Sequence, residues 1–403
     1  MRIQGKARWV GVGARGWASA LVFSCAIVSS AGCQSPQSRL TAVQIPANTP
    51  MASESTTALT PGTRATPTES VVLIALDGVR WQDVYVGVDR GMAEAEGIPE
   101  AFILPADQLL PNIHHRVIAR GVALGAPGHG APMRASGPNH LSLPGYMEML
   151  SGVVPETCRD NNCPPTRTPT LVDAFRDAVG PEGGHVGVVT SWETIERAAA
   201  VDSRGIALST GRTGGKTRET LRSDPVLSDL LDVGAQVGPH PGHGDYRSDY
   251  YTAAVALRYL STRRPRFLFV GLGDTDEWGH QDNYEAYLQS LRFADTFVGS
   301  VLDTLEMLGT YGTRTTVIVT ADHGRSDDFV GHGRSPESGR VWLVATGGVI
   351  PAVGYVDAPR ERRLADVAPT IRSLVGLPDP NGDGDVLAEL FEPVAAGAAV
   401  AQR

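Results

Sequence analysis

Short, strongly apolar segments separated by amphipathic ones constrain the fold of this chain most. Residues 71–76 are apolar throughout, and similar runs lie at 185–190, 266–273, 315–324 and 341–348. Such a run is typical of a strand buried on both faces of a parallel sheet. Residues 283–308 instead place apolar side chains at helical steps of three and four. The alternation predicts an α/β fold, doubly wound, with a mostly parallel central sheet, helices on both faces and a loop-rich cap insertion.

The composition narrows the class of protein. The chain has 403 residues, 42% of them hydrophobic, which is enough for a substantial core. Its formal net charge is −9, so a broad basic surface for a nucleic-acid polymer is not expected. A local cationic site, such as bound metal, would still attract a small anionic substrate.

The N-terminus has the pattern of an export signal. Four basic residues precede a short apolar run within residues 1–32, which we interpret as a signal peptide. The run ends in SSAGC, which resembles a bacterial lipobox and predicts lipid on Cys33. Cleavage by an ordinary signal peptidase is the alternative. We therefore expect an exported protein of the bacterial periplasm or cell envelope, anchored to the membrane as a lipoprotein through Cys33.

The rest of the chain divides by composition. Residues 33–69 are rich in Ser, Thr and Pro and predict a flexible tether. Residues 70–392 carry the apolar runs and predict one catalytic domain. Within it, residues 195–250 are rich in Gly, Ser, Thr, Arg and His and suggest the cap insertion over the site. Residues 393–403 are expected to form a disordered tail.

Two cysteines remain if the signal is removed and Cys33 carries lipid. Cys158 and Cys163 lie in the segment CRDNNC. An oxidising compartment favours a disulfide between them, closing a small loop. Metal ligation is the alternative, but few further ligands lie nearby in the sequence.

Carboxylates and histidines follow three of the predicted strands. Because the carboxyl ends of parallel strands meet at one edge of a sheet, we expect these side chains to converge there. Asp and His together suit zinc or a similar cation, and six of them can hold two ions. Each residue alone has a plainer interpretation, as a helix cap or a surface side chain. The candidate ligands are Asp77, Asp276, His280, Asp322, His323 and His332.

Five motifs occur in the order seen in the alkaline phosphatase superfamily: LDG, SGPNH, DEWGH, ADHG and GHG. They most resemble its nucleotide pyrophosphatase/phosphodiesterase-like branch. The resemblance implies one metal held by Asp276, His280 and His332, and a second held by Asp77, Asp322 and His323. Two divalent ions are expected, Zn²⁺ by default, with Mn²⁺ or Fe as alternatives.

The resemblance also implies a nucleophile between the two metals. In that branch a Thr precedes an aromatic-Pro-Asn sequence, and here Ser136 stands in that position before Gly137. A serine hydroxyl needs activation, and a metal ion can lower its pKa by coordinating it. Asn139 is expected to donate to a phosphoryl oxygen. Ser142 is the rival serine, but it lies where a helix-lining residue is expected. We predict hydrolysis of phosphate esters through a covalent phosphoseryl intermediate on Ser136.

Other functions stay open at this stage. A sulfatase has Cys or Ser, any residue, Pro, any residue, Arg; residues 136–140 match until His140 replaces the final Arg, which argues against this function. A phosphotransferase of the same superfamily, or a non-catalytic metal-binding lipoprotein, are further alternatives. The expected partner is a small-molecule phosphate ester, either monoester or diester, and the oligomeric state is undetermined. Candidate phosphate contacts are Arg134, Arg204, Arg212, Lys216 and Arg247, although solvated surface positions are the plainer interpretation.

Overall fold

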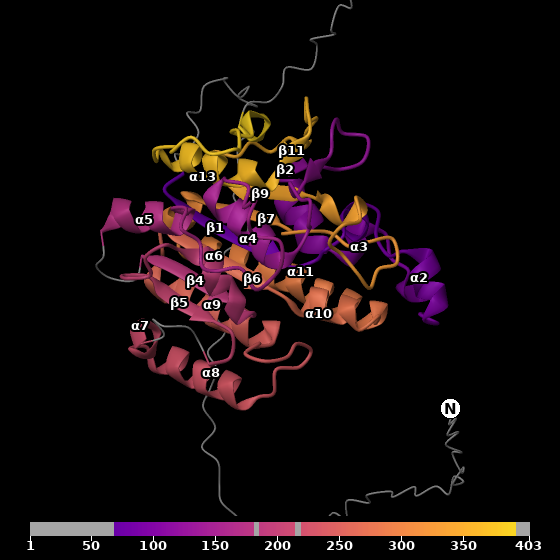
Figure 1. Ribbon diagram of the computed structural model, residues 1–403, viewed down its shortest axis with the longest axis horizontal. Coiled ribbons are helices and arrows are strands. Elements are labelled where there is room, and N and C mark those ends of the chain that lie inside the picture. The colour runs from indigo at the N-terminus through magenta and orange to yellow at the C-terminus, as the bar shows by residue number, and fades with distance from the viewer. Residues whose placement is uncertain (1–67, 181–184, 214–218, 392–403) are drawn as a thin grey trace, which may run out of the picture. The chain divides into compact units, whose positions relative to one another are not determined.

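A computed structural model of the protein describes residues 68–180, 185–213 and 219–391. The predicted signal peptide, Cys33, most of the predicted tether and the predicted tail lie outside these residues. Within the described part, the core is one eight-stranded sheet (Figure 1). Its strands, in spatial order, are β10 (Gly354–Tyr355), β2 (Gly121–Leu124), β9 (Leu343–Gly347), β7 (Thr315–Thr320), β1 (Ser70–Leu76), β6 (Phe267–Leu272), β4 (Val186–Thr190) and β5 (Ala207–Thr210).

The apolar runs of the sequence form the centre of this sheet. β1 is buried along its whole length and pairs in parallel with β6 and β7. The pairs β4–β6, β4–β5 and β10–β2 are also parallel, whereas β9 is antiparallel to both of its neighbours. The predicted α/β class with a mostly parallel sheet is therefore confirmed.

Helices cover both faces of the sheet. On β6, Phe269 contacts Tyr146 of α4 (Ser142–Ser151), and Phe267 stacks on Phe175 of α5 (Leu171–Val179). Gly187 pairs with the intervening residue of β6, and so faces the opposite side, where it lies against Tyr259 of α9 (Asp249–Arg263). Since successive side chains of a strand point to opposite faces, α4 and α5 lie on one face and α9 on the other.

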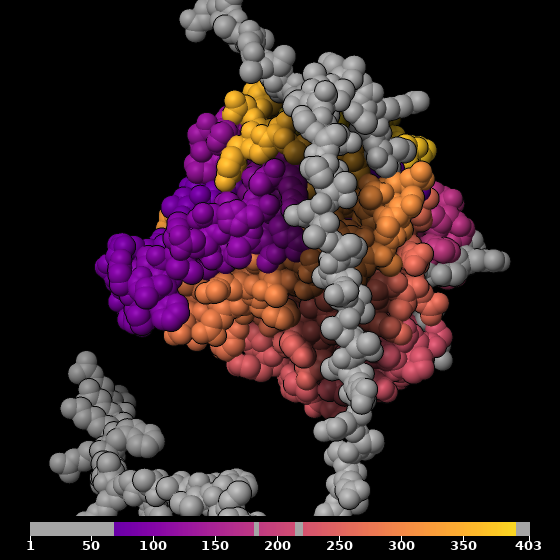
Figure 2. All heavy atoms as spheres, turned by 180° about the vertical axis from the view of Figure 1, so that it is seen from behind, coloured from indigo at the N-terminus to yellow at the C-terminus, as the bar shows by residue number. Residues whose placement is uncertain are grey.

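The long amphipathic segment forms helix α11 (Tyr284–Met307), as its periodicity predicts. Its buried Asp295 accepts hydrogen bonds from the backbone N–H groups of Asn112 and Ile113, at the start of the π-helix η2 (Ile113–Ile118). Figure 2 shows this contact zone from behind, where the purple N-terminal segments lie against the orange of α11.

Residues 195–250 contain more regular structure than their composition suggests. They supply the edge strand β5 and the helices α7 (Glu219–Arg222) and α8 (Pro225–Gln236). β5 is only four residues long, so no clear period is visible in the sequence. The remainder, between α8 and α9, is an irregular segment that reaches the end of the sheet where the predicted ligands lie.

Short elements complete the described chain. A second sheet, β11–β3–β8, has three strands of two residues each. Its strands are β3 (Met133–Arg134), β8 (Arg340–Val341) and β11 (Arg362–Arg363). The other elements are α1 (Trp81–Tyr85), α2 (Arg90–Ala95), η1 (Glu100–Phe102), α3 (Ala106–Leu109), η3 (Glu193–Ile195), α6 (Glu196–Ala199), α10 (Asp274–His280), α12 (Thr310–Thr313), η4 (Glu337–Gly339), η5 (Leu364–Asp366), α13 (Val367–Val375) and η6 (Ala388–Leu390).

The predicted disulfide is present between Cys158 and Cys163, whose Cα atoms are 5.4 Å apart. A disulfide agrees with the oxidising compartment expected for an exported protein. Among the described residues, no helix has the length and apolar content needed to cross a membrane. Lipid on Cys33 stays a prediction.

Candidate metal centre

The carboxyl ends of three neighbouring strands deliver the predicted ligands. Asp77 directly follows β1, Asp322 and His323 follow β7, and α10 begins just after β6. Because β7, β1 and β6 lie side by side, these residues meet at one edge of the sheet. Each ligand follows an apolar strand, and the sheet thus brings together side chains that are almost 250 residues apart in the chain.

The first group combines Asp77, Asp322 and His323, all buried. The Nε2 atom of His323 lies 3.3 Å from Oδ1 of Asp77 and 3.5 Å from Oδ2 of Asp322. The other ring nitrogen, Nδ1, lies 2.8 Å from the carbonyl oxygen of Gly324. This second contact fixes the ring so that Nε2 faces the two carboxylates.

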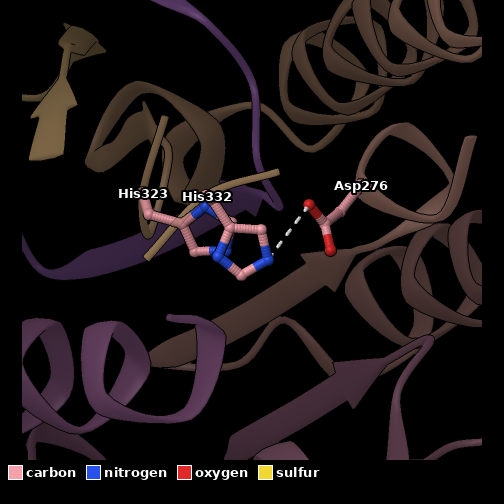
Figure 3. A group of neighbouring side chains, drawn as sticks. All are labelled: Asp276, His323 and His332. Carbon is pink, nitrogen blue, oxygen red and sulfur yellow. Dashed lines mark ion pairs between the residues drawn. The ribbon is translucent and has the colours of Figure 1, made fainter. Parts of the chain in front are cut away.

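The second group combines Asp276, His280 and His332. Asp276 and His280 stand one turn apart on α10, and His280 Nε2 lies 3.1 Å from Oδ2 of Asp276. His332 Nε2 lies 3.1 Å from His280 Nε2 and 4.0 Å from Oδ1 of Asp276. His323 stacks on His332 and joins the two groups, as Figure 3 shows with the dashed ion pair between His332 and Asp276.

The charge balance of this cluster fits divalent cations. Oδ2 of Asp322 is buried and makes no hydrogen bond to the described residues. Burial and the nearby Asp77 raise the pKa of Asp322 well above its usual range. Burial lowers the pKa of His323, but the attraction of Asp322 and Asp77 outweighs it and raises the value to about 10. Bound cations would relieve this repulsion among buried carboxylates, and carboxylate and imidazole donors suit such ions.

Arg325 is a buried residue of the site that the sequence did not reveal. Its guanidinium donates to Asp276 and to the carbonyl oxygens of Phe329 and Val330. Although burial raises the pKa of Asp276, Arg325 lowers it well below its usual range. A Cβ at Gly279 would lie 2.3 Å from the guanidinium carbon, so only glycine leaves room for it. Arg325 directly follows the motif ADHG, and only this position in the sequence could have indicated that it belongs to the site.

His332 is oriented by the segment that contains Ser136. Its Nδ1 lies 2.9 Å from the carbonyl oxygen of His140. The backbones of His140 and Gly333 also pair, with N–H···O distances of 2.9 and 3.1 Å. The motif SGPNH therefore carries a backbone carbonyl that holds a candidate ligand by its second nitrogen, an arrangement common at metal sites.

Ser136 and Asn139 do not reach the cluster in this structure. Ser136 Oγ donates to the buried carboxylate of Glu148 at 2.6 Å, and its N–H donates to the same carboxylate at 3.0 Å. The amide nitrogen of Asn139 donates to the carbonyl oxygen of Arg159 at 2.7 Å. Among the contacts of the described residues, neither side chain touches any of the six candidate ligands. In this structure their polar groups are bound to Glu148 and to the carbonyl oxygen of Arg159.

Ser142 is the serine that lies against the cluster. Its Oγ donates to Oδ1 of Asp77 at 3.3 Å and lies 3.2 Å from Nε2 of His323. It is the first residue of α4, and Tyr146, one turn later, donates to the other oxygen of Asp77 at 3.0 Å. The sulfatase pattern offered a signal, because Ser142, Leu143 and Pro144 also match Ser, any residue, Pro. Tyr146 occupies the place of the final Arg.

A cleft of about 440 Å³ opens beside Ser142. Asp77, Asp276 and His280 line it on the sheet side. The segment between α8 and α9 forms part of the facing wall, so residues 195–250 do border the site. The cleft is lined by Asp77, Ser142, Asn161, Trp192, Pro241, Gly242, His243, Tyr246, Gly273, Asp276, Glu277, His280 and Gln281.

Sequence comparison bears on this site directly. A sequence model of the Metalloenzyme superfamily matches residues 245–379, which include five of the six candidate ligands. This part of the chain is similar to enzymes of the Metalloenzyme superfamily. The predicted resemblance to the alkaline phosphatase superfamily is thereby confirmed, and enzymes of this superfamily act with divalent metal ions.

Phosphoglycerate mutases are among the curated relatives of this chain. The chain is 33% identical over 138 residues to the 2,3-bisphosphoglycerate-independent phosphoglycerate mutase of Roseobacter denitrificans, a match covering 33% of this chain and 24% of the mutase. The mutase of Rippkaea orientalis is 30% identical over 124 residues, covering 28% of this chain and 21% of the mutase. The match thus spans less than a quarter of the length of each mutase.

Solved structures of other enzymes share the fold over most of the chain. A phosphonate monoester hydrolase from Silicibacter pomeroyi superposes with a TM-score of 0.53 and 16% identity, covering 83% of this chain and 78% of that one. Alkaline phosphatase PafA superposes with a TM-score of 0.51 and 11% identity, covering 82% of this chain and all of that one. At these identities the likeness shows the fold alone.

Proposed function

We propose that this protein hydrolyses phosphate esters with two bound divalent metal ions, using Ser142 as the nucleophile. The observation that carries the proposal is the position of Ser142 Oγ, within hydrogen-bond reach of Asp77 and His323 at the edge of the cleft. When bound, the ions would neutralise the buried carboxylates, stabilise charge on phosphoryl oxygens and lower the pKa of a coordinated hydroxyl or water. This proposal moves the nucleophile from Ser136 to Ser142.

The residues around Ser142 would each have a defined task. Asp77 accepts the hydroxyl proton of Ser142 in a hydrogen bond, and Tyr146 holds the other oxygen of that carboxylate. These contacts fix the Oγ atom at the start of α4, and the N-terminus of a helix favours an anion. Ser142 Oγ would pass its proton to Asp77 and attack phosphorus, and the ester oxygen would leave and take a proton from water. Water would then attack the phosphoryl group on the serine, releasing phosphate from a monoester or a phosphate monoester from a diester, and Ser142 Oγ would regain its proton.

The cleft supports a monoanionic phosphodiester as the preferred substrate. A monoester dianion needs more positive charge than a diester, and no Lys or Arg is among the described residues that line the cleft. The neutral wall of Trp192, Pro241 and Tyr246 suits the second ester group of a diester. The basic residues considered from the sequence are engaged elsewhere or undescribed: Arg134 pairs with Glu361, Arg204 with Asp202, Arg212 with the Val237 carbonyl and Arg247 with Ser209, while Lys216 lies outside the described residues.

A comparison of two serine variants tests the nucleophile. With bis-p-nitrophenyl phosphate as substrate, Ser142→Ala is expected to lower kcat by about 10³-fold or more, whereas Ser136→Ala keeps a large part of it. Acid quenching followed by peptide mass spectrometry should find a p-nitrophenyl phosphoryl group on Ser142 with this diester, and phosphate on Ser142 with p-nitrophenyl phosphate. Phosphate on Ser136, or full turnover by Ser142→Ala, would overturn the assignment. Parallel assays with p-nitrophenyl phosphate measure the diester preference.

Zinc is the proposed metal. Three carboxylates and three imidazoles form a borderline donor set, for which zinc is a common partner. Metal analysis of the purified protein is expected to find about two zinc ions per chain. Manganese or iron at the same stoichiometry would change the metal and leave the reaction class unaltered.

Phosphoryl transfer to an alcohol is the second candidate, favoured by the phosphoglycerate mutases among the relatives. Both reactions share the attack by Ser142 and differ in whether water or an alcohol takes the phosphoryl group. Adding glycerol or glycerate during turnover and measuring the phosphorylated alcohol distinguishes them. A sulfatase is tested in the same assay with p-nitrophenyl sulfate. Lipid attachment to Cys33 is tested separately by mass spectrometry of the mature N-terminus.

A further inference from the structure

We propose that Phe329 is a positioning residue for the candidate metal centre: its buried ring fixes the loop 324–332, so that Arg325 and His332 reach the second group of candidate ligands. The inference rests on the proposed function, because it takes His332 to be a metal ligand. Phe329 does not line the cleft, and among the contacts of the described residues it touches none of the six candidate ligands. It therefore acts on the site only through the loop that carries it.

The backbone of Phe329 is unusual for an aromatic residue. Its φ angle is +66°, in the left-handed region that favours glycine. Four non-glycine residues in the described part of the chain have a positive φ, and Phe329 is the buried one, with 3% of its surface exposed. Such a conformation persists where surrounding contacts hold it in place, and it is common next to functional sites.

Two tyrosines of α11 hold the ring of Phe329. The rings of Tyr284 and Tyr287 each meet it nearly at right angles, with centroids 5.1 Å away. The hydroxyls of these tyrosines donate to the two oxygens of the buried Asp83, at 2.6 and 2.9 Å. Arg80 also donates to Asp83, and its guanidinium lies 5.8 Å from the centroid of the Phe329 ring. The ring is thus enclosed by aromatic side chains whose polar ends are bound to one carboxylate.

Phe329 contacts Arg325 with its ring and with its backbone. The Phe329 carbonyl oxygen accepts a hydrogen bond from Nε of Arg325, and the ring centroid lies 5.4 Å from the guanidinium carbon. The carbonyl oxygen of Val330 accepts from the same guanidinium at 2.7 Å. Arg325 in turn donates to Asp276. The position of this candidate ligand therefore depends on the backbone at Phe329.

The same loop ends at His332. Only Val330 and Gly331 lie between Phe329 and this histidine. The loop is closed on itself, because the N–H of Ser326 donates to the Gly331 carbonyl oxygen at 2.8 Å and the N–H of Phe329 donates to the Ser326 carbonyl oxygen at 2.9 Å. A shift of Phe329 would therefore move the backbone that carries His332.

The substitution Phe329→Leu removes the aromatic contacts and keeps an apolar side chain. In chelator-treated protein titrated with Co²⁺ and followed by visible absorption, we expect one of the two sites to bind about 10- to 100-fold more weakly. The site of Asp77, Asp322 and His323 should keep its affinity. Phe329→Met, which fills more of the space, is measured in parallel, so that poor folding of the leucine variant does not end the test.

Phe297→Leu is the matched control. Phe297 also packs in the core on α11, with 2% of its surface exposed, and undergoes the same chemical change. Both leucine variants are expected to unfold at lower temperature, but Phe297→Leu should bind two Co²⁺ ions with wild-type affinity. The comparison separates positioning of a ligand from a general loss of packing.

A double-mutant cycle tests whether Phe329 acts through His332. In the His332→Ala background, Phe329→Leu should weaken Co²⁺ binding less than it does in the wild-type background, because coupled residues are not additive. An undiminished cost in that background would overturn the positioning of His332.

The remaining outcomes distinguish this inference from the proposed function. Equal Co²⁺ affinities in Phe329→Leu, Phe329→Met and Phe297→Leu, or an equal loss at both sites, would overturn the role of Phe329 while leaving two-metal hydrolysis in place. If wild type itself does not bind two ions, the proposed function fails, and the role of Phe329 fails with it.

Discussion

The Nδ1 atom of His332 lies 2.9 Å from the carbonyl oxygen of His140, although 192 residues separate the two in the chain. That contact links the motif SGPNH to the candidate metal centre through backbone rather than through its serine. The His140 ring is packed against Gly137 and Gly339, where an added Cβ would lie 2.6 and 2.7 Å from its Cε1 atom. The position of the carbonyl therefore depends on two residues without side chains.

The first prediction concerns Gly339. Gly339→Ala is expected to push the His140 ring aside, shift its carbonyl and reorient His332. Loss of such an outer contact commonly weakens metal binding by about 10- to 100-fold. Zinc titration should find one weakened site of the two and reduced activity at limiting zinc. Gly91→Ala, on an exposed face where the nearest atom is 3.4 Å from the new Cβ, is the control. Unaltered zinc affinity in Gly339→Ala would contradict the role given to the His140 carbonyl.

The second prediction concerns Ser136 and Glu148. The buried Glu148 carboxylate accepts from Ser136 Oγ, from Ser136 N–H and from Ala365 N–H. Removing the hydroxyl with Ser136→Ala is expected to lower the free energy of unfolding by about 2 kcal/mol, as for a hydrogen bond to a charged group. Ser142→Ala, in contrast, should affect turnover far more than stability. Urea denaturation of both variants, with metal present, measures the difference. A stable but inactive Ser136→Ala would reverse the two assignments.

The two serines show where inference from this sequence stops. The six candidate ligands were identifiable because each carboxylate or histidine follows an apolar strand or a short motif, and the fold then brings strand ends together. Ser136 and Ser142 are six residues apart, and both precede a proline by two positions. The start of α4 decides which of the two hydroxyls faces the strand ends. It also depends on which serine donates to Glu148 and which to Asp77. Those are tertiary contacts, and a single sequence does not display them.

Short elements were missed for a related reason. β2 and β5 have four residues each, too few to show a period, and they are strands because neighbouring strands supply their hydrogen bonds. Arg325 was missed because an arginine after a histidine motif looks like a surface residue. It is buried because Gly279 leaves space for its guanidinium and Asp276 provides its counter-charge.

The third prediction links pH to metal removal. In the metal-free protein the pKa of Asp322 is raised above its usual value, mainly by burial, and that of His323 is raised to about 10. Each group has a higher pKa in the folded state than in the unfolded chain. At pH values above the pKa of the unfolded chain, the folded state therefore binds more protons. Stability from both groups is therefore present at low pH and is lost as pH rises. For Asp322 the loss begins above the ordinary carboxyl pKa, and for His323 it runs from about pH 6.5 to about pH 10.

Metal binding should reverse this loss. Bound cations repel the extra protons and stabilise the folded state in proportion to their affinity. We expect the rise in melting temperature on adding zinc to chelator-treated protein to be larger at pH 8 than at pH 5.5. Differential scanning fluorimetry at the two values measures it. Asp322→Asn should shrink the difference, because its amide does not titrate. An equal zinc effect at both values would contradict the assignment of this cluster.

The fourth prediction concerns Arg325 and Asp276. Both side chains are buried, and the guanidinium of Arg325 donates to the Asp276 carboxylate. Removing one partner of a buried pair leaves the other charge uncompensated, which commonly costs about 3 kcal/mol or more. Arg325→Met is therefore expected to destabilise the metal-free protein by about that amount. The exposed pair of Arg204 and Asp202 provides the control, since Arg204→Met should cause no measurable change.

Metal should rescue Arg325→Met in a way that separates charge from packing. If Asp276 binds a cation, saturating zinc supplies the missing positive charge, and the variant should recover most of its lost stability. If the loss reflects only the space left by the guanidinium against Gly279, zinc will raise the stability of wild type and variant equally. Urea denaturation of both proteins, with chelator and with zinc, gives the four values needed. A larger zinc effect on the variant than on wild type identifies Asp276 as a ligand, and parallel shifts would remove it from the set.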